Sequence, residues 1–117
     1  YLWAATFDGL VRFDGVRFTV FSTANTPGLP SNRLIRLVEG RDHTLWLTTE
    51  QGHLVRFRGG RAMTVAGAGE LTTGSALAID TARGGETLWF QTRDGVGVLR
   101  TGADRMEPIA RDRTMEE

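Results

Sequence analysis

The chain has 117 residues, of which 40% are hydrophobic and 24% are charged, a composition typical of a globular protein with a single core. Fourteen basic residues balance fourteen acidic ones, so the net charge of zero excludes a general attraction to nucleic acid or to an anionic membrane surface. The absence of cysteine excludes disulfides and thiol nucleophiles, and no apolar run reaches the roughly 18 to 20 residues that span a bilayer. We therefore expect neither a nucleic-acid partner nor direct insertion into a membrane.

A repeat of 43 residues organises the chain. The pair Leu-Trp occurs at 2–3, at 45–46 and at 88–89, and a glycine follows six residues after each tryptophan. Two unrelated features with one period indicate a repeat architecture. We expect the tryptophans to be core residues and the glycines to supply the positive φ of tight turns. The residues with these structural roles are Trp3, Trp46, Trp89, Gly9, Gly52 and Gly95.

Each copy consists of short apolar runs bounded by turn residues. Runs such as LWLTT at 45–49 and LVRF at 54–57 are too short for helices, and no segment has helical periodicity. The second copy predicts strands near 33–38, 44–49, 53–58 and 61–65, joined by tight turns into a four-stranded antiparallel meander. The sequence therefore predicts an all-β fold.

The length of the repeat selects among all-β folds. About 40 to 45 residues per four-stranded unit is the spacing of a β-propeller blade. Trp46 and Leu47 must point to opposite faces of their strand, yet both are large and apolar. This arrangement suits a sheet that is covered on both sides by neighbouring blades.

The chain holds about 2.7 such repeats, whereas a closed propeller needs roughly four to eight blades. We expect a segment of a longer polypeptide whose missing blades come from the parent chain or from identical chains, three of which would supply about eight blades. Both alternatives remain open. The predicted units are a partial blade without its inner strand, with its connector (1–32), a complete blade with its connector (33–75), a second complete blade (76–109) and a polar tail (110–117).

The segments LWAATFDGLVRFDGVRFTVF at 2–21 and GLPSNRLIRLVEGRDHTLWLTTEQGHLVRF at 28–57 resemble the two-component regulator propeller repeat. The resemblance extends to about residue 109 and weakens in the third copy, where Thr73, Gly74 and Ser75 stand in place of Pro30, Ser31 and Asn32. It implies a bacterial, periplasmic sensor region that precedes a membrane helix and a histidine kinase or diguanylate cyclase output domain. Any kinase or cyclase activity would then belong to the longer parent chain.

The sequence contains no known catalytic or metal-binding pattern. His43 and His53 lie in or beside turns, where we expect exposed side chains, and they lack the spacing of metal ligands. Asp8 and Asp94 occupy equivalent turns, and this repetition favours a turn requirement over a catalytic pair. The sequence predicts no catalytic residue, no metal site and no cofactor.

Basic residues recur at Arg12 and Arg56, with Arg17, Arg58 and Arg61 nearby. Their acidic neighbours favour pairing across strands over a stripe that binds nucleic acid.

Three residues are candidates for ligand contacts. Ser31 and Asn32 lead into a predicted inner strand that also carries Arg36, and inner strands surround the central channel of a propeller. The competing interpretation is a turn held by structural hydrogen bonds.

The leading hypothesis is a non-catalytic sensor segment that binds a small molecule or a glycan ahead of the output domain. The alternatives are a protein-interaction scaffold that promotes dimerisation and, third, a propeller lyase or hydrolase.

Overall fold

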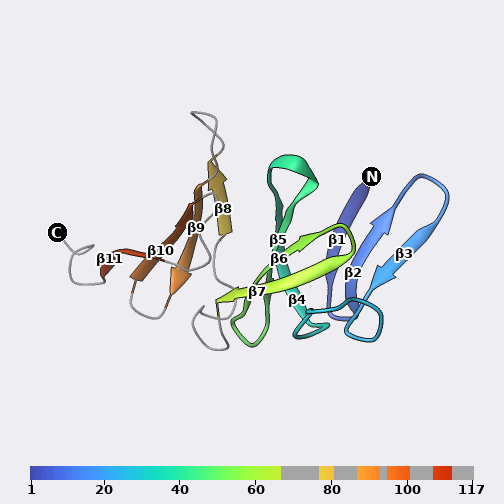
Figure 1. Cartoon of the computed structure of the whole chain (residues 1–117), viewed down its shortest axis with the longest axis horizontal. Coiled ribbons are helices and arrows are strands. Elements are labelled where there is room, and N and C mark those ends of the chain that lie inside the picture. Colours follow the sequence, from blue (N-terminus) through green and yellow to red (C-terminus); the bar gives the residue numbers. More distant parts are fainter. Residues whose placement is uncertain (67–76, 81–86, 93–94, 101–106, 112–117) are drawn as a thin grey trace.

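The computed structural model describes residues 1–66, 77–80, 87–92, 95–100 and 107–111, and in this part of the chain the fold is all-β, as the sequence predicts. Three separate antiparallel sheets follow one another along the chain (Figure 1). The first sheet contains β1 (Leu2–Thr6), β2 (Gly9–Phe13) and β3 (Phe18–Phe21). The middle sheet contains β4 (Leu34–Glu39), β5 (Leu45–Thr49), β6 (Leu54–Arg58) and β7 (Arg61–Ala66). The third sheet contains β8 (Leu77–Asp80), β9 (Thr87–Thr92), β10 (Gly95–Arg100) and β11 (Glu107–Arg111).

The middle sheet confirms the four strands predicted for the second copy to within one residue at each end. Two details differ from the sequence prediction. A single turn of 3-10 helix, η1 (Arg41–His43), joins β4 to β5. The sequence does not reveal it, because a helical turn of three residues is too short to show any periodicity. β11 extends to Arg111, two residues into the predicted polar tail of 110–117, and residues 112–117 lie outside the described part of the chain.

The glycine that follows the Leu-Trp strand in each copy has the positive φ that the sequence predicts. Gly9, Gly52 and Gly95 have φ of +123°, +90° and +137°, a region that residues with a Cβ rarely adopt. At Gly9 a Cβ would also collide with the carbonyl oxygen of Phe21 on β3. A larger residue there would push β2 away from β3.

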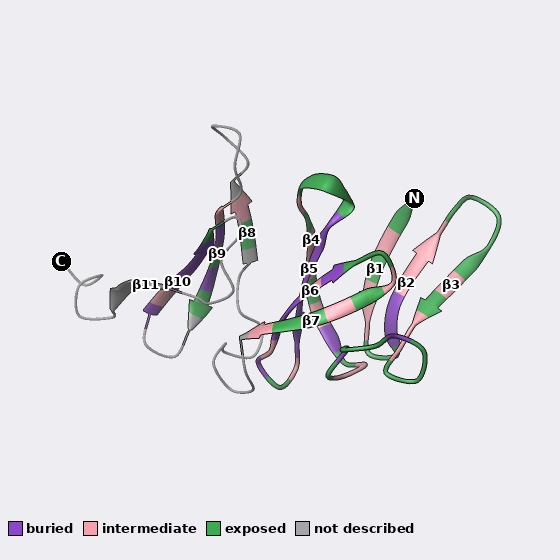
Figure 2. Ribbon diagram, in the orientation of Figure 1, coloured by how far each residue is buried: buried purple, intermediate pink, exposed green. Residues whose placement is uncertain are grey.

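Strand alternation gives the middle sheet two apolar faces, and both are covered. The first core joins the first and middle sheets, and the second core joins the middle and third sheets. Figure 2 shows β5 and β6 buried between their neighbours. The first core consists of Leu10, Leu29, Leu34, Leu45, Leu47, Val55 and Phe57. The second core consists of Trp46, Leu54, Leu88, Phe90 and Leu99.

The sheets are stacked face to face with their first strands adjacent. β4 contacts β8 of the third sheet on one side and β1 of the first sheet on the other. The first and third sheets lie at opposite ends of this stack (Figure 1). In the part of the chain that the structure describes, the face of the first sheet that carries Leu2 and Phe18 is open, with these side chains 70% and 71% exposed.

The segment between the first and middle sheets packs tightly against β7. The carbonyl of Pro27 accepts a hydrogen bond of 2.9 Å from the backbone N–H of Ala62, and Leu29 is buried in the first core. Gly28 has φ +86°, and a Cβ on it would collide with the carbonyl oxygen of Ala62. This segment thus fastens the chain leaving the first sheet to the outer strand of the middle sheet.

An exposed ion pair makes a second link between these sheets. The guanidinium of Arg33 donates to both carboxylate oxygens of Glu50, at 3.0 and 3.2 Å. The same guanidinium lies 4.4 Å from the centre of the Phe7 ring, in the turn between β1 and β2. Arg33 therefore contacts turns from both sheets.

Candidate functional site

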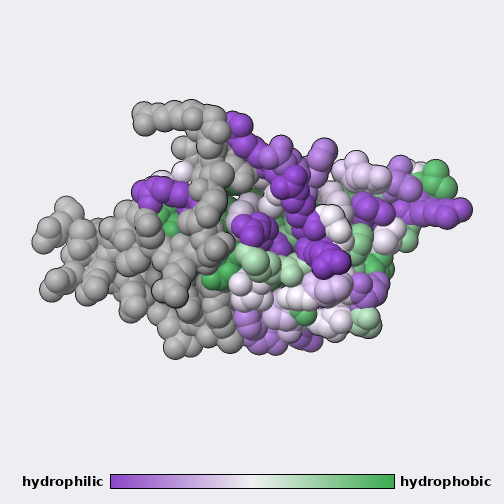
Figure 3. Space-filling view, in the orientation of Figure 1, coloured by the Kyte–Doolittle hydropathy of each residue, from purple (hydrophilic) through white to green (hydrophobic). Residues whose placement is uncertain are grey.

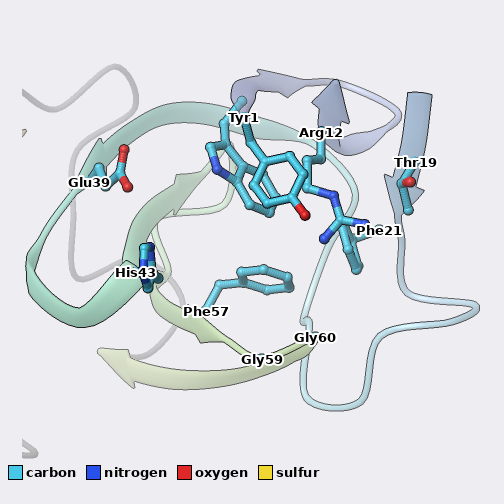
Figure 4. A pocket seen from close by; sticks show the side chains of 10 residues that line it. Tyr1, Arg12, Thr19, Phe21, Glu39, His43, Phe57, Gly59 and Gly60 are labelled. Atoms are coloured by element: carbon cyan, nitrogen blue, oxygen red, sulfur yellow. The ribbon is translucent and has the colours of Figure 1, made fainter. Parts of the chain in front are cut away.

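A pocket of about 660 Å³ opens between the first sheet and the ends of the middle-sheet strands (Figure 4). One wall comes from the face of the first sheet that packs on the first core. The other wall comes from the end of β4, from η1 and from the turn between β6 and β7. The lining residues are Tyr1, Trp3, Arg12, Thr19, Phe21, Glu39, His43, Phe57, Gly59 and Gly60.

Aromatic rings form the base of the pocket. The ring centre of Trp3 lies 6.0 Å from that of Phe21 and 5.8 Å from that of Phe57, and the Phe21 and Phe57 centres are 5.0 Å apart. Both contacts of Phe57 are edge-to-face, an arrangement that aromatic quadrupoles favour. Phe57 is buried while the Tyr1 ring, edge-on to Trp3 at 6.3 Å, is exposed. The base is therefore buried on one side and open to solvent on the other.

Arg12 covers these rings with its guanidinium. Its central carbon lies 4.8 Å from the ring centre of Tyr1, 5.4 Å from that of Phe21 and 5.8 Å from that of Trp3. At these distances the positive charge is attracted by the ring faces. The N–H donors of the guanidinium lie beside the apolar rings, so one ligand can contact both the hydrogen-bond donors and the rings.

Glu39 and His43 form the polar rim on the opposite wall. Both side chains are exposed, and Figure 4 shows them across the pocket from Arg12. The tight connection from β4 to β5 places them there, with Asp42 and His43 in the left-handed region at φ +55° and +63°. The rim therefore offers a carboxylate and an imidazole opposite a guanidinium.

The contacts of Arg12 and Arg56 correct the cross-strand ion pairing that the sequence predicts. Arg12 lies opposite Trp3 on one side and Thr19 on the other, and Arg56 lies opposite Trp46 and Met63. Hairpin register thus puts an aromatic ring, not a carboxylate, beside each arginine. The Arg56 guanidinium lies 5.9 Å from the Trp46 ring centre, close to the 5.8 Å of the Arg12 and Trp3 pair.

Arg58 and Arg61 also lack the acidic cross-strand neighbours that the sequence predicts. They face each other across the turn at Gly59 and Gly60, so two like charges are cross-strand neighbours.

The three ligand candidates from the sequence do not line this pocket. Ser31 Oγ accepts the backbone N–H of Arg33 at 3.1 Å, and Asn32 Oδ1 accepts the backbone N–H of Thr23 at 2.7 Å. Arg36 is exposed on β4. Ser31 and Asn32 therefore hold the connector between sheets.

The histidines lie in different surroundings. His43 is exposed, as the sequence predicts, but His53 is half-buried, which differs from the expectation of an exposed turn residue. Its ring Nδ1 lies 2.9 Å from Thr49 Oγ1, and that oxygen also accepts the backbone N–H of His53 at 3.0 Å. Thr49 thus holds His53 against the end of β5.

Asp8 and the two histidines form no metal-binding cluster in the described part of the chain. Asp8 is exposed in the turn after β1, and Asp94 lies outside the described residues. Among the residues that the structure describes, no three His, Asp or Glu side chains gather as a metal site. In the same part of the chain, no helix has the length and hydrophobicity to cross a membrane.

Sequence reasoning missed the pocket, although one signal was available. Counting outward from the two-residue turn at Phe7 and Asp8 places Arg12 opposite Trp3. The contribution of Phe57 and His43 was not available in this way, because they come from the next sheet.

Comparisons with protein-family models, with curated proteins and with solved structures found no match.

Proposed function

We propose that the three sheets are consecutive blades of a β-propeller. Three observations support this proposal: each sheet comes from one copy of the 43-residue repeat, the sheets stack face to face, and the first strands β4 and β8 are adjacent. A propeller needs further blades to complete its ring, and these would come from a longer parent chain or from other copies of this chain.

The proposed role is ligand sensing in a bacterial signal-transduction protein. Its support is the resemblance of residues 2–57 to the two-component regulator propeller repeat. On this proposal the segment is periplasmic and non-catalytic, and it passes the binding event to a histidine kinase or a diguanylate cyclase elsewhere in the parent chain.

The pocket between the first and middle sheets is the proposed binding site, and its aromatic and charged lining is the observation that carries the proposal. A sugar ring has an apolar face of C–H groups that stacks on aromatic rings, and its hydroxyls form hydrogen bonds with charged side chains. Trp3 and Tyr1 supply the rings, while Arg12 and Glu39 supply a donor and an acceptor. We therefore propose a glycan, or a small molecule of similar polarity, as the ligand.

Titration with defined sugars tests this proposal. The probes are glucose, N-acetylglucosamine, cellobiose and galacturonic acid, with binding measured by calorimetry and by the change in tryptophan fluorescence. Arg12→Ala removes the guanidinium from the pocket, whereas Arg56→Ala removes the equivalent arginine of the next repeat, which does not line it. We expect at least one probe to bind and Arg12→Ala to weaken its binding at least tenfold, with Arg56→Ala within twofold of the unmodified chain.

Two results would contradict the binding site. One is the absence of binding by all four probes at millimolar concentration. The other is equal weakening by both substitutions, which would point to a general loss of packing. Thermal unfolding of both variants, followed by circular dichroism, separates such a loss from a local effect.

A further inference from the structure

Arg12 lines the pocket as a cation whose contacts are with aromatic rings. Its side chain is half-buried, and its guanidinium lies over the rings of Tyr1, Phe21 and Trp3. Within the described part of the chain, no oxygen accepts a hydrogen bond from this guanidinium and no acidic side chain forms an ion pair with it. A guanidinium has five N–H donors in a fixed plane, and contact with ring faces leaves these donors for a ligand in the pocket.

Arg33 shows what a guanidinium on an aromatic ring binds in this molecule. Its central carbon lies 4.4 Å from the centre of the Phe7 ring, and its Nε and Nη2 donate to the two carboxylate oxygens of Glu50 at 3.0 and 3.2 Å. The planar fork of arginine fits a carboxylate in this way, with two parallel hydrogen bonds. Arg12 has the aromatic contacts of the same arrangement beside a pocket of about 660 Å³. A carboxylate is therefore the group that best matches Arg12.

Asp14 is the carboxylate of the chain on which the charge of Arg12 acts, and it is held elsewhere. The backbone N–H groups of Arg17 and Val16 each donate to its Oδ1 at 2.8 Å, and these bonds are the main reason that its pKa is low. Arg12 lowers that pKa further through its charge, without an ion pair in the described part of the chain. Asp14 does not line the pocket. It therefore leaves the pocket side of Arg12 to a ligand.

The opposite wall combines positive charge with one carboxylate. Arg58 and Arg61 flank the turn between β6 and β7, which lines the pocket, and they face each other across these strands. Figure 3 shows strongly hydrophilic surface over the middle sheet. Two adjacent like charges attract an anion over the Debye length of about 8 Å at physiological salt. The acidic lining residue is Glu39, across the pocket from Arg12 (Figure 4), and its carboxylate can accept hydrogen bonds from hydroxyl groups.

We propose that the pocket selects a sugar that bears a carboxylate, a uronic acid, and that Arg12 determines this selection. Arg12 donates two hydrogen bonds to the carboxylate, the sugar ring stacks on Trp3, and sugar hydroxyls donate to Glu39. The inference rests on the proposed function, because it takes the pocket as a sugar-binding site, and it narrows the ligand from glycans in general to acidic ones. A neutral sugar lacks the ion pair, and a small carboxylate without a ring lacks the stacking.

Compounds that differ from one another in one group test this proposal. Galacturonate has a carboxylate where galactose has a hydroxymethyl group, and the methyl ester of galacturonate has the same ring without the charge. Acetate has the carboxylate without the ring, and glucuronate with glucose repeats the comparison in a second ring configuration. Calorimetry at neutral pH and low salt gives the Kd of each. We expect galacturonate to bind at least tenfold more tightly than galactose, its own methyl ester and acetate, and glucuronate to exceed glucose by a similar factor.

Two matched variants locate the origin of this preference. Arg12→Gln keeps an N–H donor but removes the charge and the planar fork, whereas Arg56→Gln makes the same change at the arginine over Trp46, outside the pocket. The ratio of galacturonate to galactose affinity should fall below threefold in Arg12→Gln and stay within twofold of the unmodified chain in Arg56→Gln. Raised ionic strength should weaken galacturonate binding and leave galactose binding unchanged. Circular dichroism confirms that each variant is folded.

Four results would count against the inference, and they separate it from the proposed function. Equal affinity for the acidic and neutral sugars would overturn the inference and leave the sugar-binding site intact. A preference for galacturonate that Arg12→Gln retains would assign the recognition of the anion to other charges, such as Arg58 and Arg61. Acetate binding as tight as galacturonate binding would make the pocket an anion site that does not recognise the sugar ring. Absence of binding by every sugar would contradict the proposed function and the inference together.

Discussion

The side chains of Trp46 and Leu47 are neighbours in β5 and are buried in two different cores. Trp46 is 6% exposed in the second core, and Leu47 is fully buried in the first core. One strand therefore contributes hydrophobic burial on both sides of the middle sheet, at roughly 1.5 to 3 kcal/mol for each large side chain. The middle sheet depends on both neighbours for its stability, and the ends of the stack depend on one neighbour each.

The position shared by Leu2 and Leu45 tests this dependence directly. Leu45→Ala should lower the free energy of unfolding by about 2 to 5 kcal/mol, because it leaves a cavity in the first core. Leu2→Ala should change that free energy by less than about 0.5 kcal/mol, because Leu2 is exposed in the isolated chain. Urea unfolding at a dilution where the chain is monomeric provides the measurement. Equal effects of the two substitutions would contradict the assignment of the covered and uncovered faces.

Alanine substitutions at Gly28 and Gly59 distinguish the cost of backbone strain from the cost of a steric collision. Both have positive φ, of +86° and +59°, so alanine at either position costs about 1 kcal/mol of stability. Only at Gly28 would the added Cβ also collide, with the carbonyl oxygen of Ala62, whereas nothing lies within 4 Å at Gly59. We expect Gly28→Ala to be more destabilising than Gly59→Ala by at least about 1 kcal/mol in thermal or urea unfolding. A Gly28→Ala variant as stable as Gly59→Ala would show that the connector does not press on β7.

The adjacent residues Thr48 and Thr49 should respond in opposite directions to the same substitution. Thr48 Oγ1 is buried without a hydrogen-bond partner in the described part of the chain, so Thr48→Val should raise the free energy of unfolding by up to about 1 kcal/mol. Thr49 Oγ1 accepts the backbone N–H of His53, so Thr49→Val should lower that free energy by about 1 to 2 kcal/mol. Chemical denaturation of the two variants compares them directly. Loss of stability in Thr48→Val would mean that its hydroxyl has a partner after all.

The turn at Asp14 gives a pH-dependent prediction. Hydrogen bonds from the backbone N–H groups of Arg17 and Val16, both 2.8 Å to Oδ1, lower the pKa of the Asp14 carboxyl, and the nearby charge of Arg12 lowers it further. Because the folded-state pKa is below that of the unfolded chain, ionised Asp14 stabilises the fold at pH values above the unfolded pKa. That contribution is lost as the pH falls through the folded pKa.

Titration of the Asp14 carboxyl by NMR should therefore give a midpoint below the usual aspartate value of about 3.9. The midpoint should stay low at 1 M salt, because hydrogen bonds are its main cause and salt screens only the contribution of Arg12. A return to the ordinary value at high salt would assign the effect to charge instead.

The sequence by itself determined the secondary structure and its period. The Leu-Trp pairs and the glycines that follow them recur every 43 residues, and the hydrophobic runs between turns are short enough to exclude long helices. These signals are local: a glycine with positive φ at 9, 52 and 95 is required by its own turn, whatever surrounds it. For this reason the strands of the second copy were predictable to within one residue.

Only the tertiary structure decided where the pocket and the uncovered faces lie. Phe57 and Trp3 are 54 positions apart in the chain and meet because the middle sheet stacks on the first. Equivalent residues such as Leu2 and Leu45 are identical in sequence but differ from 70% to 1% in exposure, since exposure depends on whether another sheet lies over them. Burial and site geometry are properties of contacts between distant segments, and a repeated local pattern has no information about which copy lies at the end of the stack.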